Sequence, residues 1–348
     1  RKGNAMRALM KDKPAPGAVL KEIATPKIGP KDLLVKVKSA AICGTDVHIY
    51  EWTKFAQDRI KPPMVFGHEF SAEVVEVGSQ VEAFKVGDRV AADTHVPCGH
   101  CFQCTTGLQH VCRDMKILGV HTEGVFSDYA LLPASCAWKM DDSISWDTGA
   151  TMEPFGIPVH ALAKIKVAGK RVGVFGCGPI GIYAQVIARY SGAGMVIAVE
   201  KTEERMALAR KMGTEHLINF DKSDVVAEMN KLTKGHGLDV LLEITGAPEA
   251  LNTGLKALRR GGEVSLVGLY SGIVPVDLVE GMIYKEATVY GITGRVMWDT
   301  WWTAQGILTS GRADISPVIT HHFPIEEYKK GFELAKEGKC GKVVFTFD

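Results

Sequence analysis

The stretches AAICGTDVHIY and VFGHEF bring a thiol, two imidazoles and a carboxylate into a short part of the chain. A catalytic zinc ion needs about three protein ligands and one position that stays open for substrate. Cys43 and His68 supply a thiolate and an imidazole, and either Glu69 or the more distant Glu153 could add a carboxylate. A buried cysteine and histidine are more often plain core residues, so other parts of the chain must decide between a core and an open metal site.

Four further cysteines follow the pattern C-x₂-C-x₂-C-x₇-C: Cys98, Cys101, Cys104 and Cys112. Four thiolates form a closed tetrahedral zinc site, which is structural because no position remains for substrate. An iron–sulfur cluster is the alternative, because C-x₂-C-x₂-C also begins a ferredoxin motif. That motif continues with x₃-C-P, whereas seven residues without a proline intervene here. The spacing therefore favours structural zinc over a cluster and over unliganded thiols.

The segment VGVFGCGPIGIYA contains Gly176, Gly178 and Gly181 in the pattern G-x-G-x-x-G. The pattern is weak alone, but here it leaves an apolar strand and opens a helix. Gly176 permits a tight turn, Gly178 lets the backbone approach a pyrophosphate, and Gly181 lets helix and strand pack closely. The free N–H groups of the helix N-terminus then attract phosphates. This context predicts a dinucleotide site rather than an ordinary strand–turn–helix.

An acidic residue follows the glycine loop at the expected distance. Glu200 ends the next strand, 19 residues after Gly181. An acid at that place accepts hydrogen bonds from ribose hydroxyls and repels a 2′-phosphate, which selects NAD over NADP. The nearby cations Lys201 and Arg205 weaken this prediction, and a solvated strand end is the alternative role for Glu200.

Two kinds of element must position these residues. In the first 150 residues, LLVKVKSAAI and FSAEVVEVGSQV alternate apolar and polar residues with a period of two, and GDRVAA is a further short strand. Short strands of this kind, separated by Pro and Gly, suggest a compact barrel.

From about residue 155, strands and helices alternate, which predicts a parallel sheet covered on both faces. The segment PEALNTGLKALRRGG is expected to be helical. The expected strands number six, as in a doubly wound dinucleotide fold: RVGVFG, MVIAVE, HLINF, DVLLEIT, EVSLVGL and ATVYGIT. From Val296 onward, a Trp-rich helix and the strand KVVFTF return to the first domain.

Composition excludes several classes of function. The chain has 348 residues, 41 basic and 40 acidic side chains and a net charge of +1. No broad surface therefore attracts nucleic acid or an anionic membrane, and a small molecule is the expected partner. No apolar run approaches the roughly 18 residues that span a bilayer, and the first residues lack the apolar core of a secretory signal. We expect a cytoplasmic protein.

The combination of motifs resembles the zinc-dependent medium-chain alcohol dehydrogenases. GHE at 67–69, GDRV at 87–90, the four-cysteine lobe at 98–112 and the glycine-loop domain carry this resemblance, which covers essentially all residues after Met6. It implies an α/β protein with two domains. Residues 1–154 and 296–348 would form a GroES-like β-barrel catalytic domain, and residues 155–295 a Rossmann NAD-binding domain with a doubly wound parallel sheet.

The resemblance also implies roles for particular residues. Two zinc ions per chain are implied, one catalytic on Cys43, His68 and Glu69 and one structural on the four-cysteine lobe. Thr45 and His48 correspond to a proton relay, and Glu153 to an acidic residue near the metal. The implied NAD contacts are Gly176, Gly178, Ile180, Gly181, Glu200, Arg205, Val267, Gly268, Leu269, Ile292 and Thr293.

Within the family, CGTDVHIYEW, EPFGIPVHA and GITGRVMWDTW resemble members that oxidise L-threonine, usually as homotetramers, in threonine degradation. L-Threonine carries an ammonium and a carboxylate, and burying either without a partner is costly. We expect Glu153 to serve the ammonium and Arg295 the carboxylate. A polyol or 2,3-butanediol dehydrogenase of the same family is the first alternative. A non-catalytic protein that binds zinc and nucleotide is the second.

Overall fold

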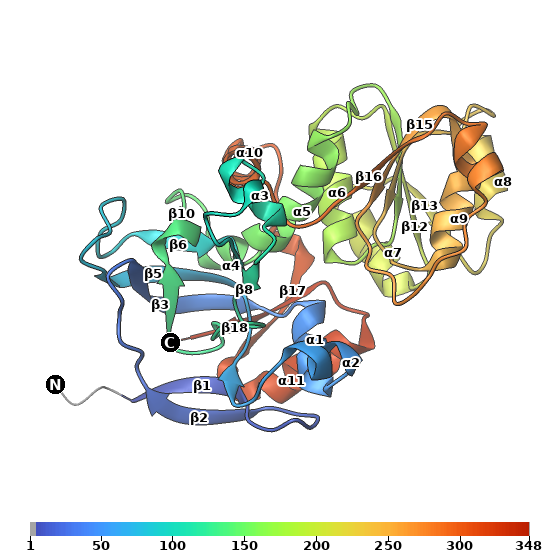
Figure 1. Ribbon diagram of the computed structural model, residues 1–348. Helices are drawn as coiled ribbons and strands as arrows, with labels where there is room; N and C mark the ends of the chain where they lie inside the picture. Colours follow the sequence, from blue (N-terminus) through green and yellow to red (C-terminus); the bar gives the residue numbers. More distant parts are fainter. Residues whose placement is uncertain (1–4, 348) are drawn as a thin grey trace. The chain divides into compact units, whose positions relative to one another are not determined.

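The computed structural model describes residues 5–347 and divides into two compact units (Figure 1). Within the described residues, the first unit comprises residues 5–154, Val296–Thr309 and residues 319–347, and the second comprises Phe155–Arg295 and Ser310–Val318. Ser310–Val318 therefore groups with the second unit, whereas the sequence assigned all residues after Val296 to the first. A contact supports the assignment of Ser310–Val318 to the second unit: the Arg312 guanidinium lies 4.8 Å from the ring centroid of Tyr190 in helix α6 (Pro179–Tyr190).

The first unit is built on a seven-stranded sheet in which six strands follow the order β10-β6-β5-β3-β18-β17, while β9 pairs with β3. A three-stranded sheet, β2-β1-β4, and a two-stranded one, β7-β8, complete the unit. The strands are β1 (Ala5–Lys11), β2 (Val19–Ala24), β3 (Asp32–Ala41), β4 (Met64–Val65), β5 (Glu69–Val77), β6 (Arg89–Ala92), β7 (His95–Val96), β8 (Lys116–Ile117), β9 (Tyr129–Pro133), β10 (Ala137–Lys139), β17 (Ile319–Pro324) and β18 (Lys342–Thr346).

The pairing of β3 with β5 positions the metal-site residues. The two strands are antiparallel, and Ala41 at the end of β3 lies opposite Glu69 at the start of β5. Cys43 follows β3 by two residues and His68 precedes β5 by one, so the register brings them together. Strand β18 pairs with the same end of β3, with Val344 opposite Ala41. The pairing is interrupted by two register shifts, between Leu34 and Val35 and between Val37 and Ser39, and it continues from Ser39 to Ala41, where it positions the metal-site end of both strands.

The helices of the first unit lie around these sheets: α1 (Gly44–Glu51), α2 (Lys54–Arg59), α3 (Phe102–Thr105), α4 (Trp146–Ala150), α10 (Asp299–Thr309) and α11 (Tyr328–Glu337). Helix α11 packs Phe332 into the core against Phe66, Phe126 and Phe345. The Trp-rich helix predicted after Val296 is α10, where buried Trp301 donates its indole N–H to Asp93 at 2.9 Å. Helix α11 and strand β17 were not predicted from the sequence.

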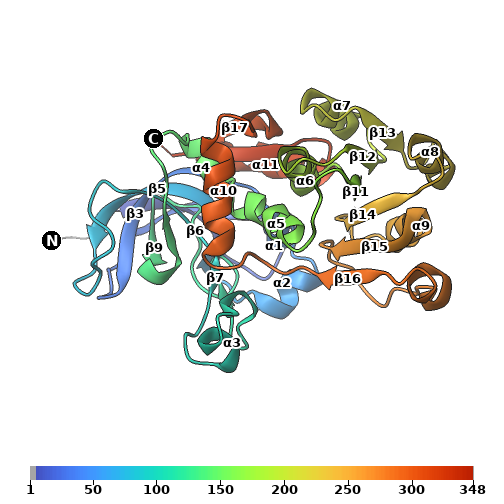
Figure 2. The same ribbon diagram turned by 90° about the horizontal axis from the view of Figure 1, so that it is seen from above.

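The second unit contains a six-stranded parallel sheet with the order β13-β12-β11-β14-β15-β16. Its strands are β11 (Arg171–Phe175), β12 (Met195–Glu200), β13 (His216–Asn219), β14 (Leu238–Glu243), β15 (Leu258–Leu266) and β16 (Thr288–Gly291). Helices α6 (Pro179–Tyr190) and α7 (Glu203–Lys211) cover one face, and α8 (Val225–Leu232) and α9 (Pro248–Ala257) the other (Figure 2). This is the doubly wound order, and the prediction of a six-stranded dinucleotide fold is confirmed.

One boundary prediction was wrong. The expected helix over PEALNTGLKALRRGG ends at Ala257, and its last residues begin β15, where Leu258 pairs with Leu238 of β14. The Lys285 ammonium donates hydrogen bonds to the carbonyl oxygens of Leu255 at 2.6 Å and Leu258 at 2.5 Å. These contacts satisfy carbonyl groups at the helix end, and they come from a residue distant in sequence.

Helix α5 (Met152–Ala163) begins in the first unit and continues into the second. Among residues 5–347, no helix is both long enough and apolar enough to cross a membrane.

Candidate functional site

The three residues expected to hold a catalytic metal come together in the first unit. One ligand atom each from Cys43, His68 and Glu69 lies within 4.8 Å of the other two. His68 and Glu69 are buried, and Cys43 is partly exposed. The set offers a thiolate, an imidazole and a carboxylate, which is a donor combination that suits zinc. Three protein ligands leave one tetrahedral position for a further molecule.

The N-terminus of α1 orients Cys43 and His68. Cys43 is the N-cap residue, and its backbone N–H donates to Asp46 Oδ2 at 2.9 Å. Asp46 is fully buried, and its Oδ1 lies 3.4 Å from His68 Nδ1, an ion-pair distance without hydrogen-bond geometry. Burial lowers the pKa of His68, but the charges of Asp46 and Cys43 raise it by more, and the net direction is upward. The site therefore attracts a positive charge, which fits a metal ion as well as a proton.

Glu69 is paired with Lys342. The Lys342 ammonium is buried, donates to Glu69 Oε2 and lies 3.2 Å from the Ile42 carbonyl oxygen. The other oxygen of Glu69, Oε1, is buried without a hydrogen-bond partner among the described residues. Burial raises the pKa of the Glu69 carboxyl, and the net direction remains upward although Lys342 and His68 lower it. A buried acceptor of this kind is costly unless a ligand satisfies it, which supports the fit of a metal ion.

Glu153 lies near these ligands at the start of α5. It is buried, its Oε1 accepts a hydrogen bond from the Thr94 hydroxyl at 2.9 Å, and its charge raises the pKa of Glu69. The structure therefore places two carboxyl groups, Glu69 and Glu153, in the same region of the first unit. Only Glu69 belongs to the cluster of mutually close ligand atoms.

Thr45 and His48 lie on α1, one turn apart, so they share a face of the helix. Thr45 is partly buried, whereas His48 is exposed, and His48 Nδ1 lies 3.2 Å from the Thr53 hydroxyl. The pair thus extends from the helix N-terminus beside Cys43 toward solvent.

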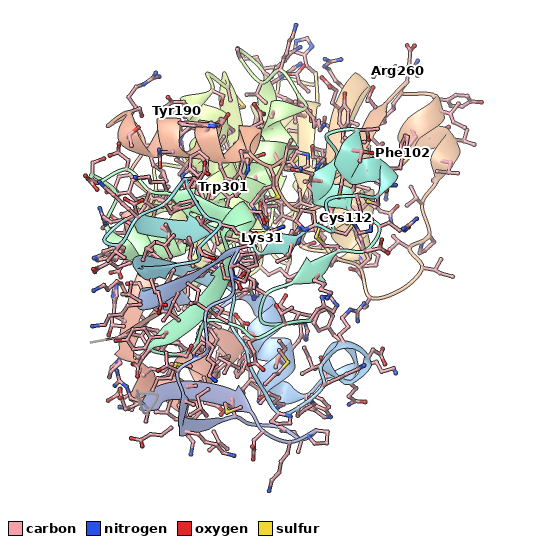
Figure 3. All side chains as sticks on the ribbon, turned by 60° about the vertical axis from the view of Figure 1, so that its left-hand side comes forward. Lys31, Phe102, Cys112, Tyr190, Arg260 and Trp301 are labelled. Atoms are coloured by element: carbon pink, nitrogen blue, oxygen red, sulfur yellow. The ribbon has the colours of Figure 1, made fainter. Side chains whose placement is uncertain are left out.

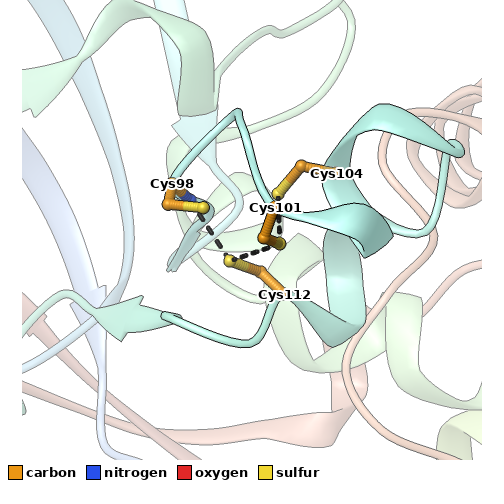
Figure 4. A group of neighbouring side chains, drawn as sticks. All are labelled: Cys98, Cys101, Cys104 and Cys112. Atoms are coloured by element: carbon orange, nitrogen blue, oxygen red, sulfur yellow. Dashed lines mark hydrogen bonds between the residues drawn. The ribbon is translucent and has the colours of Figure 1, made fainter.

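The four cysteines of the lobe also converge (Figure 4). The Sγ atoms of Cys101 and Cys104 are 3.5 Å apart and those of Cys101 and Cys112 are 3.7 Å apart. A disulfide would need about 2.05 Å, whereas Zn–S bonds of about 2.3 Å place sulfurs of a tetrahedron about 3.8 Å apart. The separations therefore fit four thiolates around zinc. Phe102, the first residue of α3, is exposed on the same lobe, in which Cys112 is buried (Figure 3).

Backbone groups also favour thiolate in this lobe. Hydrogen bonds from the Cys104 and Arg113 backbones lower the pKa of Cys101, and the Cys98 N–H donates to Cys112 Sγ at 3.3 Å. Burial raises the pKa of Cys104 by more than a backbone hydrogen bond from Gly99 lowers it. Thiolates are the forms that bind metal.

The glycine loop of the second unit borders a pocket of about 410 Å³. Gly176, at φ +102°, has a conformation that favours glycine, and a Cβ on Gly181 would lie 1.9 Å from the Gly176 carbonyl oxygen. Six of the expected NAD contacts line this pocket: Gly176, Gly178, Ile180, Gly181, Glu200 and Arg205. Phe220, Thr245 and Ala247 line it as well and were not predicted.

Backbone groups hold Glu200 at this pocket. Glu200 Oε2 accepts from the Cys177 N–H of the glycine loop at 2.8 Å, and Oε1 accepts from the Lys201 N–H at 2.7 Å. The Arg205 guanidinium is 4.0 Å from Glu200 Oε2. Both Lys201 and Arg205 line the pocket, so it carries cations beside the acid.

The other expected contacts lie beyond the residues that line this pocket. Val267, Gly268 and Leu269 follow β15, and Ile292 and Thr293 follow β16, all at the carboxyl edge of the parallel sheet. Arg295 is buried, two residues beyond Thr293. The Gly294 carbonyl oxygen of this segment lies 3.0 Å from His160 Nδ1.

Three contributors to the metal site were missed from the sequence. Asp46 had a local signal, since it lies three residues after the N-cap Cys43, the spacing of a capping box. Thr94 and Lys342 had none, because their contacts with Glu153 and Glu69 join residues 59 and 273 positions apart.

The fold and the two ligand groups define a zinc-dependent dehydrogenase of the alcohol dehydrogenase class. Residues 29–142 match the model of the alcohol dehydrogenase GroES-like domain, and residues 179–308 match that of the zinc-binding dehydrogenases. The chain belongs to the zinc-binding dehydrogenase family, and the expected family and fold class are confirmed.

Particular relatives narrow the class. An L-threonine 3-dehydrogenase from Pyrococcus abyssi is 48% identical over 341 residues, covering 98% of each chain. The structure of 2R,3R-butanediol dehydrogenase from Bacillus subtilis is 31% identical with a TM-score of 0.89, covering 99% of this chain and 100% of that one. A zinc-binding dehydrogenase structure from Sinorhizobium meliloti, bound to NADP, is 26% identical with a TM-score of 0.90 and the same coverage.

Proposed function

We propose that the protein oxidises L-threonine to 2-amino-3-oxobutanoate, with NAD⁺ as the hydride acceptor and zinc at the Cys43, His68 and Glu69 site. The oxidation removes a hydride from C3 and a proton from its hydroxyl group, which yields the ketone, NADH and one released proton. The observation that carries the proposal is the convergence of those three ligand atoms within 4.8 Å, with a buried Glu69 oxygen left unpaired. The similarity to L-threonine 3-dehydrogenase supports the choice of substrate.

The chain's own residues have separate tasks in this reaction. Zinc, when bound, supplies a Lewis acid that makes a substrate hydroxyl easier to deprotonate. Cys43, His68 and Glu69 would hold that ion, and the Lys342 ammonium donates a hydrogen bond to Glu69 Oε2, which favours the charged form of this carboxyl group against the effect of burial. Asp46 orients the Cys43 backbone and places a negative charge 3.4 Å from His68 Nδ1, which favours a cation at this site. The nicotinamide supplies the hydride acceptor.

Thr45 and His48 would move the proton. Thr45, partly buried beside Cys43, accepts the proton of the substrate hydroxyl group and passes it on toward His48. His48 lies one helical turn further on and is exposed, so its imidazole can release the proton to water.

Glu153 and Arg295 would recognise the two charges of the amino acid. Glu153 is a buried carboxyl group that accepts a hydrogen bond from Thr94, and a carboxylate suits an ammonium. Arg295 follows the last strand of the parallel sheet, and a guanidinium can hold a carboxylate with two parallel hydrogen bonds. A diol or polyol offers neither charge, so these residues would distinguish the substrates.

The pocket beside the glycine loop would bind the adenosine end of NAD. Glu200 supports NAD over NADP, because its carboxylate is fixed by backbone N–H groups and would repel a 2′-phosphate. The second zinc would be structural, held by the four-cysteine lobe. Homotetramer assembly and a cytoplasmic location remain predictions from the sequence.

The test is NADH production by the purified protein with L-threonine, 2,3-butanediol and sorbitol. We expect L-threonine to give the largest kcat/KM. A larger kcat/KM for butanediol would replace the proposal with the activity of the Bacillus subtilis enzyme whose structure is similar. No NADH from any of the three would leave a binding protein as the better description.

The proposed substrate contacts have a sharper test. In Glu153→Gln and Arg295→Ala, kcat/KM for L-threonine should fall by about 30-fold or more. This fall corresponds to a loss of about 2–5 kcal/mol in transition-state binding, since a charged group of the substrate loses its partner. The value for 2,3-butanediol should fall much less. Equal losses for both substrates would show that neither residue recognises the amino acid.

A further inference from the structure

A buried carboxylate supports the turn that follows β14. Glu243 is the last residue of that strand and is fully buried. Its Oε1 accepts hydrogen bonds from the Thr245 N–H at 2.8 Å and from the Thr245 hydroxyl. Its Oε2 accepts from the Gly246 N–H at 3.2 Å and from the Tyr270 hydroxyl at 2.5 Å. Four donors therefore converge on one side chain.

The same residue also holds the turn that follows β15. The Glu243 carbonyl oxygen accepts from the N–H groups of Val267 at 2.9 Å and Gly268 at 3.0 Å. Tyr270, which donates to the side chain, belongs to this second turn. Backbone and side chain of Glu243 thus bind both turns.

The two turns touch through glycines. A Cβ on Gly268 would lie 2.2 Å from the Gly246 nitrogen and 2.8 Å from Glu243 Oε2. A Cβ on Gly246, which has φ +69°, would lie 2.4 Å from the Leu269 carbonyl oxygen. No side chain fits between the turns, so their separation depends on the hydrogen bonds that Glu243 accepts.

The first turn reaches the glycine loop. Thr245 lines the nucleotide pocket, and a Cβ on Gly176 would lie 3.0 Å from Thr245 Cγ2. The Ile244 N–H donates to the Phe175 carbonyl oxygen at 3.1 Å. A displacement of the Thr245 turn would therefore change the wall of the pocket.

We propose that Glu243 is a positioning residue for the cofactor, which fixes the turns after β14 and β15 in the arrangement that binds the dinucleotide. The inference rests on the proposed use of NAD. An ionised carboxylate only accepts hydrogen bonds, whereas an amide presents two donors on one of its ends. Replacing Glu243 with Gln would set that NH₂ group against the donors of one turn, and the turn would move.

The test compares Glu243→Gln with the unmodified protein. We expect the Kd for NADH, measured by fluorescence titration, and the KM for NAD⁺ to rise about 10-fold or more, because hydrogen bonds to a charged group are lost. The kcat at saturating NAD⁺ and the KM for L-threonine should change less than about 2-fold, because Glu243 would contact neither the substrate nor the nicotinamide. Hydrogen exchange at the Thr245, Gly246 and Gly268 amides should become faster.

A matched control lies in the same sheet. Glu263 of β15 is paired with the Tyr290 hydroxyl at 3.4 Å, and neither residue lines the pocket. Glu263→Gln should leave the Kd for NADH unchanged. Should Glu243→Gln fail to fold, Tyr270→Phe removes a single donor and should still weaken NADH binding about 3-fold.

Two results would overturn the inference: an unchanged Kd for NADH in Glu243→Gln, or equal losses in Glu243→Gln and Glu263→Gln. Both results count against the inference only if the unmodified protein itself binds NADH. Failure of the unmodified protein to bind NADH would instead refute the proposed function.

Discussion

Single residues divide between those that a short motif reveals and those that only the fold brings into place. Residue type and spacing indicated Cys43 and His68, and the family resemblance then favoured Glu69 over Glu153 as the third ligand. The structure brings the three ligand atoms together. Lys342 pairs with Glu69 across 273 positions, and nothing in its own segment distinguishes it from other lysines. A partner of this kind is set by the pairing of β18 with β3, which local sequence does not encode.

The two ligand groups should behave differently when one thiol is removed. We expect two zinc ions per chain by elemental analysis. Cys98→Ser should lose one zinc and much of the thermal stability, because a closed structural site contributes folding free energy directly. Cys43→Ser should lose the other zinc and the dehydrogenase activity while the fold survives.

Cys136 provides the control for both variants, since it is buried in the first unit but belongs to neither ligand group. Cys136→Ala should keep two zinc ions. A fully active Cys43→Ser protein would remove the catalytic role assigned to that thiol.

Glu200 should determine the choice of cofactor. In Glu200→Ala, the ratio of kcat/KM for NAD⁺ to that for NADP⁺ should fall by at least about 10-fold, equivalent to about 1.4 kcal/mol. The physical reason is the loss of both a ribose acceptor and the repulsion of a 2′-phosphate. Both cofactors should bind more weakly, because the Cys177 N–H loses its acceptor. The ratio of the two kcat/KM values separates the loss of selectivity from this general weakening.

Glu203 is the matched control for the cofactor measurement, as an exposed acid on α7 whose partner is Lys222. Glu203→Ala should leave the cofactor ratio unchanged. An unchanged ratio in Glu200→Ala would show that the Glu200 carboxylate does not select the cofactor.

At the scale of elements, the sequence predicted what periodicity and composition control. All six strands of the parallel sheet were identified, because short apolar runs that alternate with helices leave a clear pattern, although β16 is mostly exposed. The end of α9 was misplaced, because Leu258 belongs to β15, where it pairs with Leu238. Its carbonyl oxygen accepts a hydrogen bond from the Lys285 ammonium. Helix α11 went unrecognised, although Phe332 packs at the centre of the first unit.

A salt-bridge cluster at the start of β14 should make the second unit sensitive to acid. Asp239 is buried and pairs with Arg171 at 2.7 Å and with Arg259 at 2.5 Å. Burial raises the pKa of Asp239, but the hydrogen bonds from the two arginines lower it by more, and the net direction is downward. A carboxyl group whose folded pKa is depressed contributes stability above its unfolded pKa, near 3.8. That contribution is lost as the pH falls through the folded pKa.

Asp239→Asn should therefore lower the free energy of unfolding at pH 7 by about 1–3 kcal/mol. This range lies below the cost of breaking a fully buried pair, because both arginines are partly exposed. Urea unfolding from pH 7 down to pH 3 should show a constant difference between the two proteins above about pH 4 and a shrinking one below it. A difference that stays constant down to pH 3 would contradict the assigned role of the ionised carboxylate.

At the scale of the whole molecule, the sequence did not predict which apolar side chains of the second unit are exposed at its surface. Apolar side chains gather between Leu269 and Val289 and remain exposed, with Ile273 at 100% and Leu269 at 90%. The same segment leads into β16, one of the two edge strands of the parallel sheet. A sequence pattern cannot distinguish these residues from core residues, because exposure depends on where the sheet ends.

The exposed apolar segment should be an interface between copies of the chain if the expected homotetramer forms. Monomeric proteins rarely expose apolar patches larger than a few hundred Å², and an edge strand offers unpaired backbone groups to a partner. Ile283, which is 65% exposed in this segment, is a suitable probe. Ile283→Glu should reduce the mass measured by light scattering after gel filtration, because a charge would be buried without a partner. Val86→Glu, at a position of similar exposure in the first unit, should leave the mass unchanged. A monomeric unmodified protein, or a tetramer that persists in Ile283→Glu, would exclude this surface as the interface.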